Sequence, residues 1–491
     1  MKFYRWAALV WFFVMFLFFN AYASTNQTQM ITYADFSKIN YIACSMSNIY
    51  FATTEGIIKY DKMQSEWMEP LTGGVGIDNE DIRRIWSDNF DEKLYIETSQ
   101  GFYEYNLLFN RWYPINEIPQ IDNNYTHIKN PMIMYAPFGY NYSADGILID
   151  AYGRNFRFSD IVDDGSGNLW IGIWGLGVAT AGSASHIIEL LPYGLLQNDV
   201  NTIYSDNGLL LVSGDIYDSY RSGITIFDPD NNNFSYIESG INNDFPAADI
   251  NCLGGDKKYI YVGTNLGLFF LNRETQAVER TLTAQRGIPD DDVLCLKVVG
   301  DSVFVGTQEG LTVIVPANDS IHGSNPQQFA NTAIYDFETT DSTIWIASEI
   351  GAFQLHFNSG RLQKYLDPRN IIFTRAYSIE RYKNNLWLAS DDGIERLNLR
   401  TGQVKPFISI YRGSNRRPLA VNDKIAAVAT NRGVTLYFLK NTRKSGEREF
   451  TVDDGLPSAR INSLLLDGDY LWIGTDKGLT RFLWNDPDRV D

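Results

Sequence analysis

One phrase recurs along this chain, and it restricts the fold more than any other feature. Residues 471–479 read LWIGTDKGL, an apolar run followed by a short polar loop and a glycine. The glycine recurs in ten related phrases, at Gly56, Gly101, Gly177, Gly223, Gly267, Gly310, Gly351, Gly393, Gly433 and Gly478. The spacings lie between 40 and 46 residues, except for one of 76 between Gly101 and Gly177. Repeats of this length, made of short β-rich runs with turns between them, are typical of propeller blades.

Each repeat divides into four short strands. Residues 460–468 are a β-favouring inner strand that ends in Asp-Gly turn residues. LWIGT predicts a second strand and GLTRFL a third, while a variable run such as residues 448–452 predicts the outer strand. We therefore expect an all-β protein, a β-propeller of four-stranded antiparallel blades spanning residues 30–485.

Large aromatic side chains stand at the middle of the predicted second strands, at Tyr50, Tyr95, Trp170, Tyr261, Phe304, Trp345, Trp387 and Trp472. Such side chains bury about 150 to 250 Å² each. The repeated placement predicts that they fill the wedges between neighbouring sheets. The alternative is an aromatic box for a ligand.

The two ends of the repeat region predict how the ring closes. Residues 30–45 parallel residues 450–465, an outer strand and then an inner strand, but no sheet precedes them. We expect residues 30–34 to supply the outer strand of the last blade. Because nearly every connection between successive repeats is short, the sequence favours one ring of ten blades. Two smaller propellers are the alternative.

The phrases LWIGTDKGL, NLWIGIWGLG, NLWLASDDGI and YVGTNLGL resemble the two-component regulator propeller repeat. In that family the propeller is often the periplasmic sensor of a hybrid histidine kinase, and it detects glycans or other small ligands. No kinase or DNA-binding pattern follows the repeats here. The resemblance therefore implies an exported propeller that senses a ligand for a separate signalling protein.

The N-terminus and the net charge indicate where the protein works. Lys2 and Arg5 precede an uncharged run over residues 6–19, and Ala-Tyr-Ala ends at residue 23, as in a cleaved signal peptide over residues 1–23. An uncleaved anchor is the alternative. We expect a periplasmic or secreted protein without membrane insertion after cleavage. The net charge of −18 makes a nucleic-acid partner unfavourable.

The long spacing contains an insertion over residues 116–156, rich in Tyr and ending near Arg154. Antiparallel alternation places it on the same face as two loops of the neighbouring blades. We therefore predict a ligand-binding surface made by Tyr140, Tyr142, Arg154, Trp174, Asp215, Tyr217, Tyr220 and Arg221. The alternative is a hairpin that only caps the channel, since residues 139–156 alternate around a central Asp-Gly pair.

Catalysis has little support in the sequence. The histidines, His127, His186, His322 and His356, fall at unrelated repeat positions, so no metal site or cofactor is predicted. The sequence leaves open whether Asp-rich turns such as residues 228–233 bind calcium. Cys44, Cys252 and Cys295 are expected to be buried thiols. We expect a module that binds a glycan, peptide or protein partner and is not an enzyme; the alternatives are a docking scaffold of an envelope or secretion assembly and, more weakly, a lyase or hydrolase.

Overall fold

The computed structural model describes most of the chain. The described residues are 30–72, 82–89, 93–106, 111–121, 125–128, 134–143, 145–217, 221–240, 244–318, 320–322, 326–357, 359–365, 375–408, 419–439 and 446–485. The predicted signal peptide lies outside them. Within the described ranges, no helix is long and apolar enough to cross a membrane.

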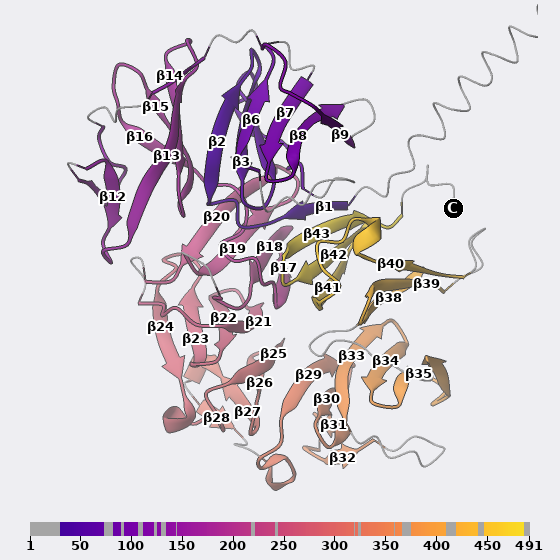
Figure 1. The fold of residues 1–491 in the computed structure, drawn as a ribbon. Coiled ribbons are helices and arrows are strands. Elements are labelled where there is room, and N and C mark those ends of the chain that lie inside the picture. The colour runs from indigo at the N-terminus through magenta and orange to yellow at the C-terminus, as the bar shows by residue number, and fades with distance from the viewer. Residues whose placement is uncertain are drawn as a thin grey trace, which may run out of the picture.

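The described strands form ten antiparallel sheets, which we call blades 1 to 10 in chain order (Figure 1). Blades 1 and 2 contain β2(Ile39–Cys44), β3(Asn48–Thr53), β4(Ile57–Asp61) and β5(Glu66–Trp67), then β6(Arg84–Ser87), β7(Lys93–Thr98), β8(Gly101–Asn106) and β9(Arg111–Ile115). Blade 3 contains β10(Thr126–His127), β11(Tyr140–Tyr142), β12(Ile147–Asp150), β13(Asn155–Asp163), β14(Asn168–Ile173), β15(Gly177–Gly182) and β16(Ile188–Leu191). The prediction of an all-β protein with four-stranded blades is confirmed, and blade 3 is larger because the insertion adds three strands.

Blades 4 to 10 each have four strands. Blades 4 to 6 contain β17(Thr202–Asp206), β18(Leu209–Ser213), β19(Gly223–Asp228), β20(Asn233–Glu238), β21(Ile250–Gly255), β22(Tyr259–Thr264), β23(Gly267–Asn272), β24(Val278–Leu282), β25(Val293–Val299), β26(Ser302–Thr307), β27(Gly310–Val315) and β28(Ser320–His322). Blades 7 and 8 contain β29(Ile334–Thr339), β30(Thr343–Ser348), β31(Gly351–His356), β32(Leu362–Lys364), β33(Ala376–Tyr382), β34(Asn385–Ser390), β35(Gly393–Asn398) and β36(Val404–Ile408). Blades 9 and 10 contain β37(Leu419–Val421), β38(Ile425–Thr430), β39(Gly433–Phe438), β40(Glu447–Phe450), β41(Ile461–Asp467), β42(Tyr470–Thr475), β43(Gly478–Leu483) and β1(Met30–Tyr33). Short 3₁₀ turns are η2(Ala284–Arg286), η3(Pro316–Asn318), η4(Gln327–Phe329) and η5(Val452–Asp454).

Local geometry explains why the phrase repeats. In LWIGTDKGL the Thr475 hydroxyl donates to the Gly478 carbonyl at 3.0 Å and accepts from the Lys477 amide at 3.0 Å. Gly478 has φ +121°, and a Cβ there would lie 2.4 Å from the Tyr33 carbonyl oxygen. The hydroxyl therefore closes the hairpin, and the glycine admits both the backbone angle and the close approach of the next strand.

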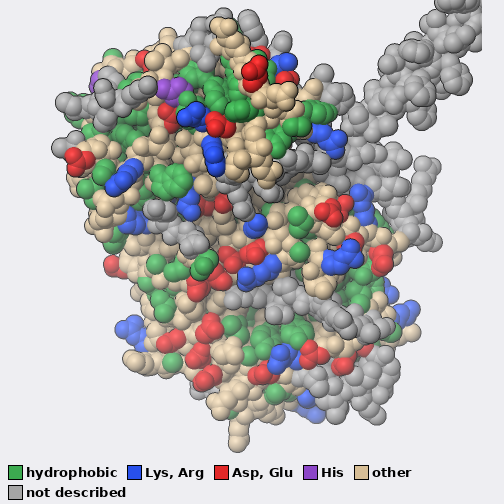
Figure 2. All heavy atoms as spheres, in the orientation of Figure 1, with side chains coloured by type: hydrophobic (Ala, Val, Ile, Leu, Met, Phe, Trp, Pro, Cys, Tyr) green, Lys and Arg blue, Asp and Glu red, His purple; other side chains and the backbone are tan. Residues whose placement is uncertain are grey.

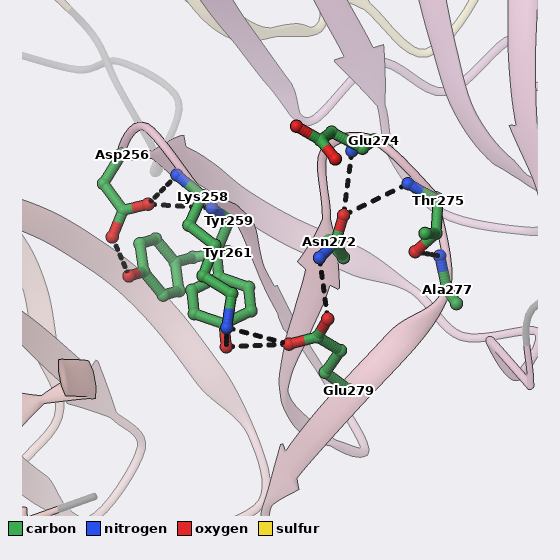
Figure 3. Close-up of polar contacts among 9 residues, drawn as sticks. All are labelled: Asp256, Lys258, Tyr259, Tyr261, Asn272, Glu274, Thr275, Ala277 and Glu279. Atoms are coloured by element: carbon green, nitrogen blue, oxygen red, sulfur yellow. Dashed lines mark hydrogen bonds and ion pairs between the residues drawn. The ribbon is translucent and has the colours of Figure 1, made fainter. Parts of the chain in front are cut away.

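The aromatic side chains fill the wedges between blades. Seven pack in hydrophobic clusters with the following blade, namely Tyr50, Trp170, Tyr261, Phe304, Trp345, Trp387 and Trp472. In blades 4 and 9 the smaller Leu211 and Ala427 take this place. A turn carboxylate orients the ring in two blades: Asp256 accepts from the Tyr261 hydroxyl (Figure 3), and Asp164 accepts from Trp170 Nε1 at 3.1 Å.

Inner-strand contacts show which blades are neighbours. The inner strands β17, β21, β25, β29, β33, β37 and β41 contact each other in this order, and β41 returns to β17. Blades 4 to 10 thus form a closed ring of seven (Figure 1). Blades 1 to 3 form an arc beside it, in which β2 lies between β6 and β13.

The prediction of one ring of ten blades is therefore wrong. The segment before blade 4 pairs with blade 10: the Val200 amide donates to the Thr475 carbonyl at 2.8 Å, and Asn462 Nδ2 donates to Asp199 at 2.6 Å. These bonds close the ring seven blades after it begins. The predicted alternative of two smaller units is nearer to the structure, although the described part of the first unit is an arc of three blades.

The closure by the N-terminal strand is confirmed. β1 pairs antiparallel with β43, so that Tyr33 lies opposite Leu479. It completes blade 10 at the point where the arc begins. One hydrophobic cluster then continues through arc and ring, and includes Trp67, Trp170, Tyr193, Phe227 and Trp472.

Candidate functional site

The insertion forms the predicted hairpin. β11 and β12 pair with Tyr140 opposite Asp150, and the Asp145-Gly146 pair lies in the turn, where Gly146 has φ +77°. β12 then pairs with the first residues of β13, which extend beyond the end of β14. β11 and β12 therefore lengthen the blade 3 sheet at the strand ends that face blade 4.

The aromatic side chains of the hairpin pack mostly on blade 3 itself. Tyr142 stacks on Phe158 with ring centroids 5.8 Å apart, and Tyr140 meets the buried Phe156 edge-on at 6.0 Å. Burial raises the pKa of both tyrosines above the usual value. Tyr140 and Tyr142 were predicted to bind a ligand, and their packing instead supports the alternative of a self-buried hairpin.

Two predicted residues meet at one carboxylate that the sequence analysis did not identify. Arg154 Nη2 donates to Glu238 Oε1 at 2.7 Å, and Arg221 Nη2 and Nε donate to Glu238 Oε2 at 2.7 and 2.9 Å. Arg154 Nε also donates to Asp150 at 2.6 Å. The Glu238 side chain is only 8% exposed. We call Asp150, Arg154, Glu238 and Arg221 the junction network, because it joins the hairpin of the arc to blade 4 of the ring.

Electrostatics favour the charged form of the two arginines in the junction network. Burial disfavours the charge on both guanidinium groups, but the hydrogen bonds and the negative charge of Glu238 outweigh it and raise the pKa of Arg154 and of Arg221. The Arg221 guanidinium lies 4.9 Å above the Tyr236 ring. Because both guanidinium groups bind carboxylates of the fold, the network is a rigid support for its surroundings.

The remaining predicted residues differ in exposure. Trp174 is half-buried, and its amide donates to the Arg157 carbonyl at 2.9 Å. Asp215 accepts from Asn201 Nδ2. Tyr217 is 83% exposed, while Tyr220 lies outside the described residues.

A second exposed tyrosine, Tyr152, lies beside the junction network. Tyr152 is 57% exposed, and its ring lies against Gly240 in the connection between β20 and β21. The amide of Ile216, next to Tyr217, donates to Asp249 at 3.0 Å in the same connection. Tyr152 thus lies near one end of this connection and the Tyr217 loop near the other end, and we call these two residues and the network the junction surface.

His127 and the three cysteines lie on strands of the described blades. The described residues contain no group of three or more His, Cys, Asp or Glu placed to hold a metal ion. His127 Nδ1 lies 2.8 Å from Asp160, whose other oxygen accepts from the Ile42 amide at 2.9 Å, so this pair connects blades 3 and 1. Cys44, Cys252 and Cys295 are buried, as predicted.

A cavity of about 600 Å³ opens in the wedge between blades 7 and 8. Its lining includes Trp345, Gln354, Tyr365, Arg381 and Leu397. Arg381 donates to the Thr339 carbonyl at 2.9 Å and to Asp341 at 3.1 Å. The volume suits a small ligand, although several polar groups of the lining already bond to the neighbouring turns.

Several solved structures are similar to this chain at low sequence identity. The sequence matches no protein-family model and no curated protein. Similar solved structures include PorZ, an essential surface component of the type-IX secretion system of Porphyromonas gingivalis, at 15% identity and TM-score 0.49 over 92% of this chain and 69% of that chain. The extracellular domain of the putative hybrid two-component system BT3049 from B. thetaiotaomicron is similar at 17% identity and TM-score 0.46, over 89% of this chain and 60% of that domain, so this chain spans less than two thirds of it. The WD40 propeller domain of Doa1 is similar at 14% identity and TM-score 0.42, over 61% of this chain and 97% of that domain.

Proposed function

We propose that the protein is an exported interaction module that binds a protein, peptide or glycan partner at the junction surface and does not catalyse a reaction. One observation carries this proposal: Tyr152 and Tyr217 are both exposed, and Tyr152 lies in the turn between Asp150 and Arg154 of the junction network. Tyrosine carries much contact energy at interfaces, and a rigid support lowers the entropy cost of binding. The N-terminal signal pattern supports action outside the cytoplasm.

The test combines two measurements on intact protein. A photo-crosslinking amino acid at position 151, an exposed residue next to Tyr152, should capture a discrete protein partner in cells, and a glycan array should detect a sugar ligand. The variant Tyr152→Ala/Tyr217→Ala should lose the captured signal at least tenfold, while Met63→Ala, with its side chain 82% exposed in blade 1, should retain it. A double variant that binds like the wild type would contradict the proposal.

The cavity between blades 7 and 8 favours a second candidate, a small-ligand sensor. If a glycan array or metabolite screen finds a ligand, Leu397→Trp should fill the cavity and abolish its binding. Under the main proposal Leu397→Trp leaves binding unchanged, whereas the double tyrosine variant removes it. The two variants therefore separate the two sites.

A further inference from the structure

Arg381 of β33 lines the cavity between blades 7 and 8 and is held mainly by main-chain oxygens. Its Nε donates to the Lys383 carbonyl at 3.0 Å, and Nη1 donates to the Thr339 carbonyl at 2.9 Å. A third bond runs from Nη2 to Asp341 at 3.1 Å, and the Asp341 side chain is 95% exposed. The guanidinium group is therefore fixed in position by both blades, while the described carboxylate that balances its charge lies in solvent.

The junction network shows the opposite arrangement. There the carboxylate partner of Arg221 is Glu238, whose side chain is only 8% exposed. An ion pair with a solvated carboxylate contributes little energy, because water competes for both groups. A ligand carboxylate can therefore replace Asp341 at Arg381 at small cost, whereas it could not replace Glu238 at Arg221.

The described lining of the cavity has a second cation, Arg400. This residue is exposed and makes no ion pair with a described residue. Two cations, Arg381 and Arg400, against the one carboxylate of Asp341 give the described lining a formal charge of +1, in a protein whose net charge is −18. The cavity is therefore a place where an otherwise acidic protein favours an anion.

Apolar side chains form another part of the described lining. Tyr365, Leu397 and Leu399 are half-buried, and the Tyr365 ring meets the buried Trp345 edge-on at 5.1 Å. Over the part of the molecule where blades 7 and 8 lie in Figure 1, Figure 2 shows hydrophobic side chains with charged side chains of both signs beside them. A volume of about 600 Å³ admits a whole small molecule, so an anion with an apolar body fits better than a bare inorganic ion.

We propose that this cavity binds a small organic carboxylate, with the anionic end at Arg381 and Arg400 and the apolar part against Tyr365 and Leu397. The inference rests on the small-ligand candidate of the proposed function and names the class of ligand for that site. The parallel N–H groups of a guanidinium match the two oxygens of a carboxylate. Because Arg381 is already held by two carbonyl groups, it loses little freedom when a ligand binds.

Isothermal titration calorimetry on the purified protein tests the proposal. The probes are phenylacetate, indole-3-acetate and cyclohexanecarboxylate, each with its primary amide as the uncharged match. At least one acid should bind with a Kd of about 1 mM, as expected for a ligand of about ten non-hydrogen atoms, and its amide should bind about tenfold more weakly. If none of the three acids binds at about 10 mM, or if acid and amide bind equally, the proposal is overturned.

Substitutions in the cavity identify the groups that bind the acid. Arg381→Gln should weaken its binding about tenfold, and Leu397→Trp should abolish it by filling the cavity. Asp341→Asn should instead tighten binding by about threefold, because it removes the carboxylate that competes for Arg381, and a merely structural arginine gives no such gain. The matched control is Arg375→Gln, which breaks an ion pair with Glu349 outside the cavity and should leave binding unchanged.

The outcomes separate this inference from the proposed function. Circular dichroism melting curves show whether each variant is folded, and a folded Arg381→Gln variant that binds the acid like the wild type overturns the proposal. A screened metabolite of another class that is lost in Leu397→Trp, without binding of any acid, overturns the carboxylate and keeps the cavity as a ligand site. The Tyr152→Ala/Tyr217→Ala variant should bind the acid like the wild type, so a failure at the junction surface is distinguishable.

Discussion

Arg154 and Arg221 bind the same carboxylate, one at each oxygen of Glu238. Arg154 follows the hairpin of the arc, whereas Arg221 and Glu238 belong to blade 4 of the ring. The Glu238 side chain thus connects the arc to the ring. The aromatic cluster around Tyr193 does the same in the interior.

We predict that Glu238→Gln destabilises the protein by about 2 to 3 kcal/mol, because removing one member of a largely buried charge cluster leaves the others without compensation. We expect a loss near the lower end of the range for broken buried ion pairs, because the Arg154 side chain is 27% exposed. Urea unfolding at neutral pH measures the change. The matched control is Glu279→Gln, which breaks an ion pair with the exposed Lys258 (Figure 3) and should change stability little. Equal effects of the two substitutions would contradict this account of the junction network.

A second prediction concerns Asp35, which is buried between arc and ring. Burial raises the pKa of this carboxyl, although hydrogen bonds from Ser37 and the charges of Lys38 and Arg221 oppose the rise. The folded state then binds the proton more tightly than the unfolded state, so this group's contribution to stability is greatest below the unfolded pKa of about 3.9 and declines as the pH rises through the folded pKa. Asp35→Asn removes this decline.

The measurement for Asp35 is urea unfolding of both proteins at about pH 4 and about pH 7. The stability of Asp35→Asn relative to the wild type should increase from the lower to the higher pH. The amide oxygen can still accept from the Ser37 amide, which donates to Asp35 at 2.9 Å. A relative stability that falls with rising pH would mean that the carboxylate is favoured in the folded state.

A third prediction concerns the carboxylate that orients a wedge aromatic. The Tyr261 hydroxyl donates to Asp256, whose other oxygen accepts from the Lys258 and Tyr259 amides (Figure 3). Asp256→Ala should cost about 2 kcal/mol because it leaves three donors without this partner, whereas Tyr261→Phe removes one hydrogen bond and should cost about 1 kcal/mol. Thermal unfolding of the single and double variants checks this. If the effects of the two substitutions simply add, the hydroxyl and the carboxylate do not act together.

The repeat phrase made the blades predictable, and the reason is local. Thr475, Gly478 and their equivalents define a hairpin whatever surrounds it, and Trp472 must enter a wedge because it is large and apolar. The outer strand at residues 30–34 was predictable since blade 10 lacked one. The hairpin of the insertion followed from Asp145-Gly146 in the same way.

The order of the blades was not predictable from spacing, because it depends on contacts between segments far apart in the chain. The join between blades 3 and 4 is short, yet Tyr193, Leu195 and Val200 within it are buried at the boundary between arc and ring. Glu238 was missed for a similar reason: it lies 84 residues from Arg154, and an acidic residue at the end of an outer strand has no distinctive pattern. The spacing of 76 residues was the one signal that marked the interrupted arc.

The continuous core between arc and ring leads to a last prediction. Tyr33 on β1 packs against Phe227 and Phe234 of blade 4, with ring centroids 4.7 and 5.7 Å apart, and belongs to the cluster that also contains Trp67 of blade 1. Because one core serves both parts, differential scanning calorimetry of the wild type should show a single cooperative transition. Tyr33→Ala should cost about 3 to 5 kcal/mol through the cavity it leaves, and should separate the arc transition from that of the ring. Two transitions already present in the wild type would show that arc and ring are stable independently, in spite of the hydrophobic cluster that they share.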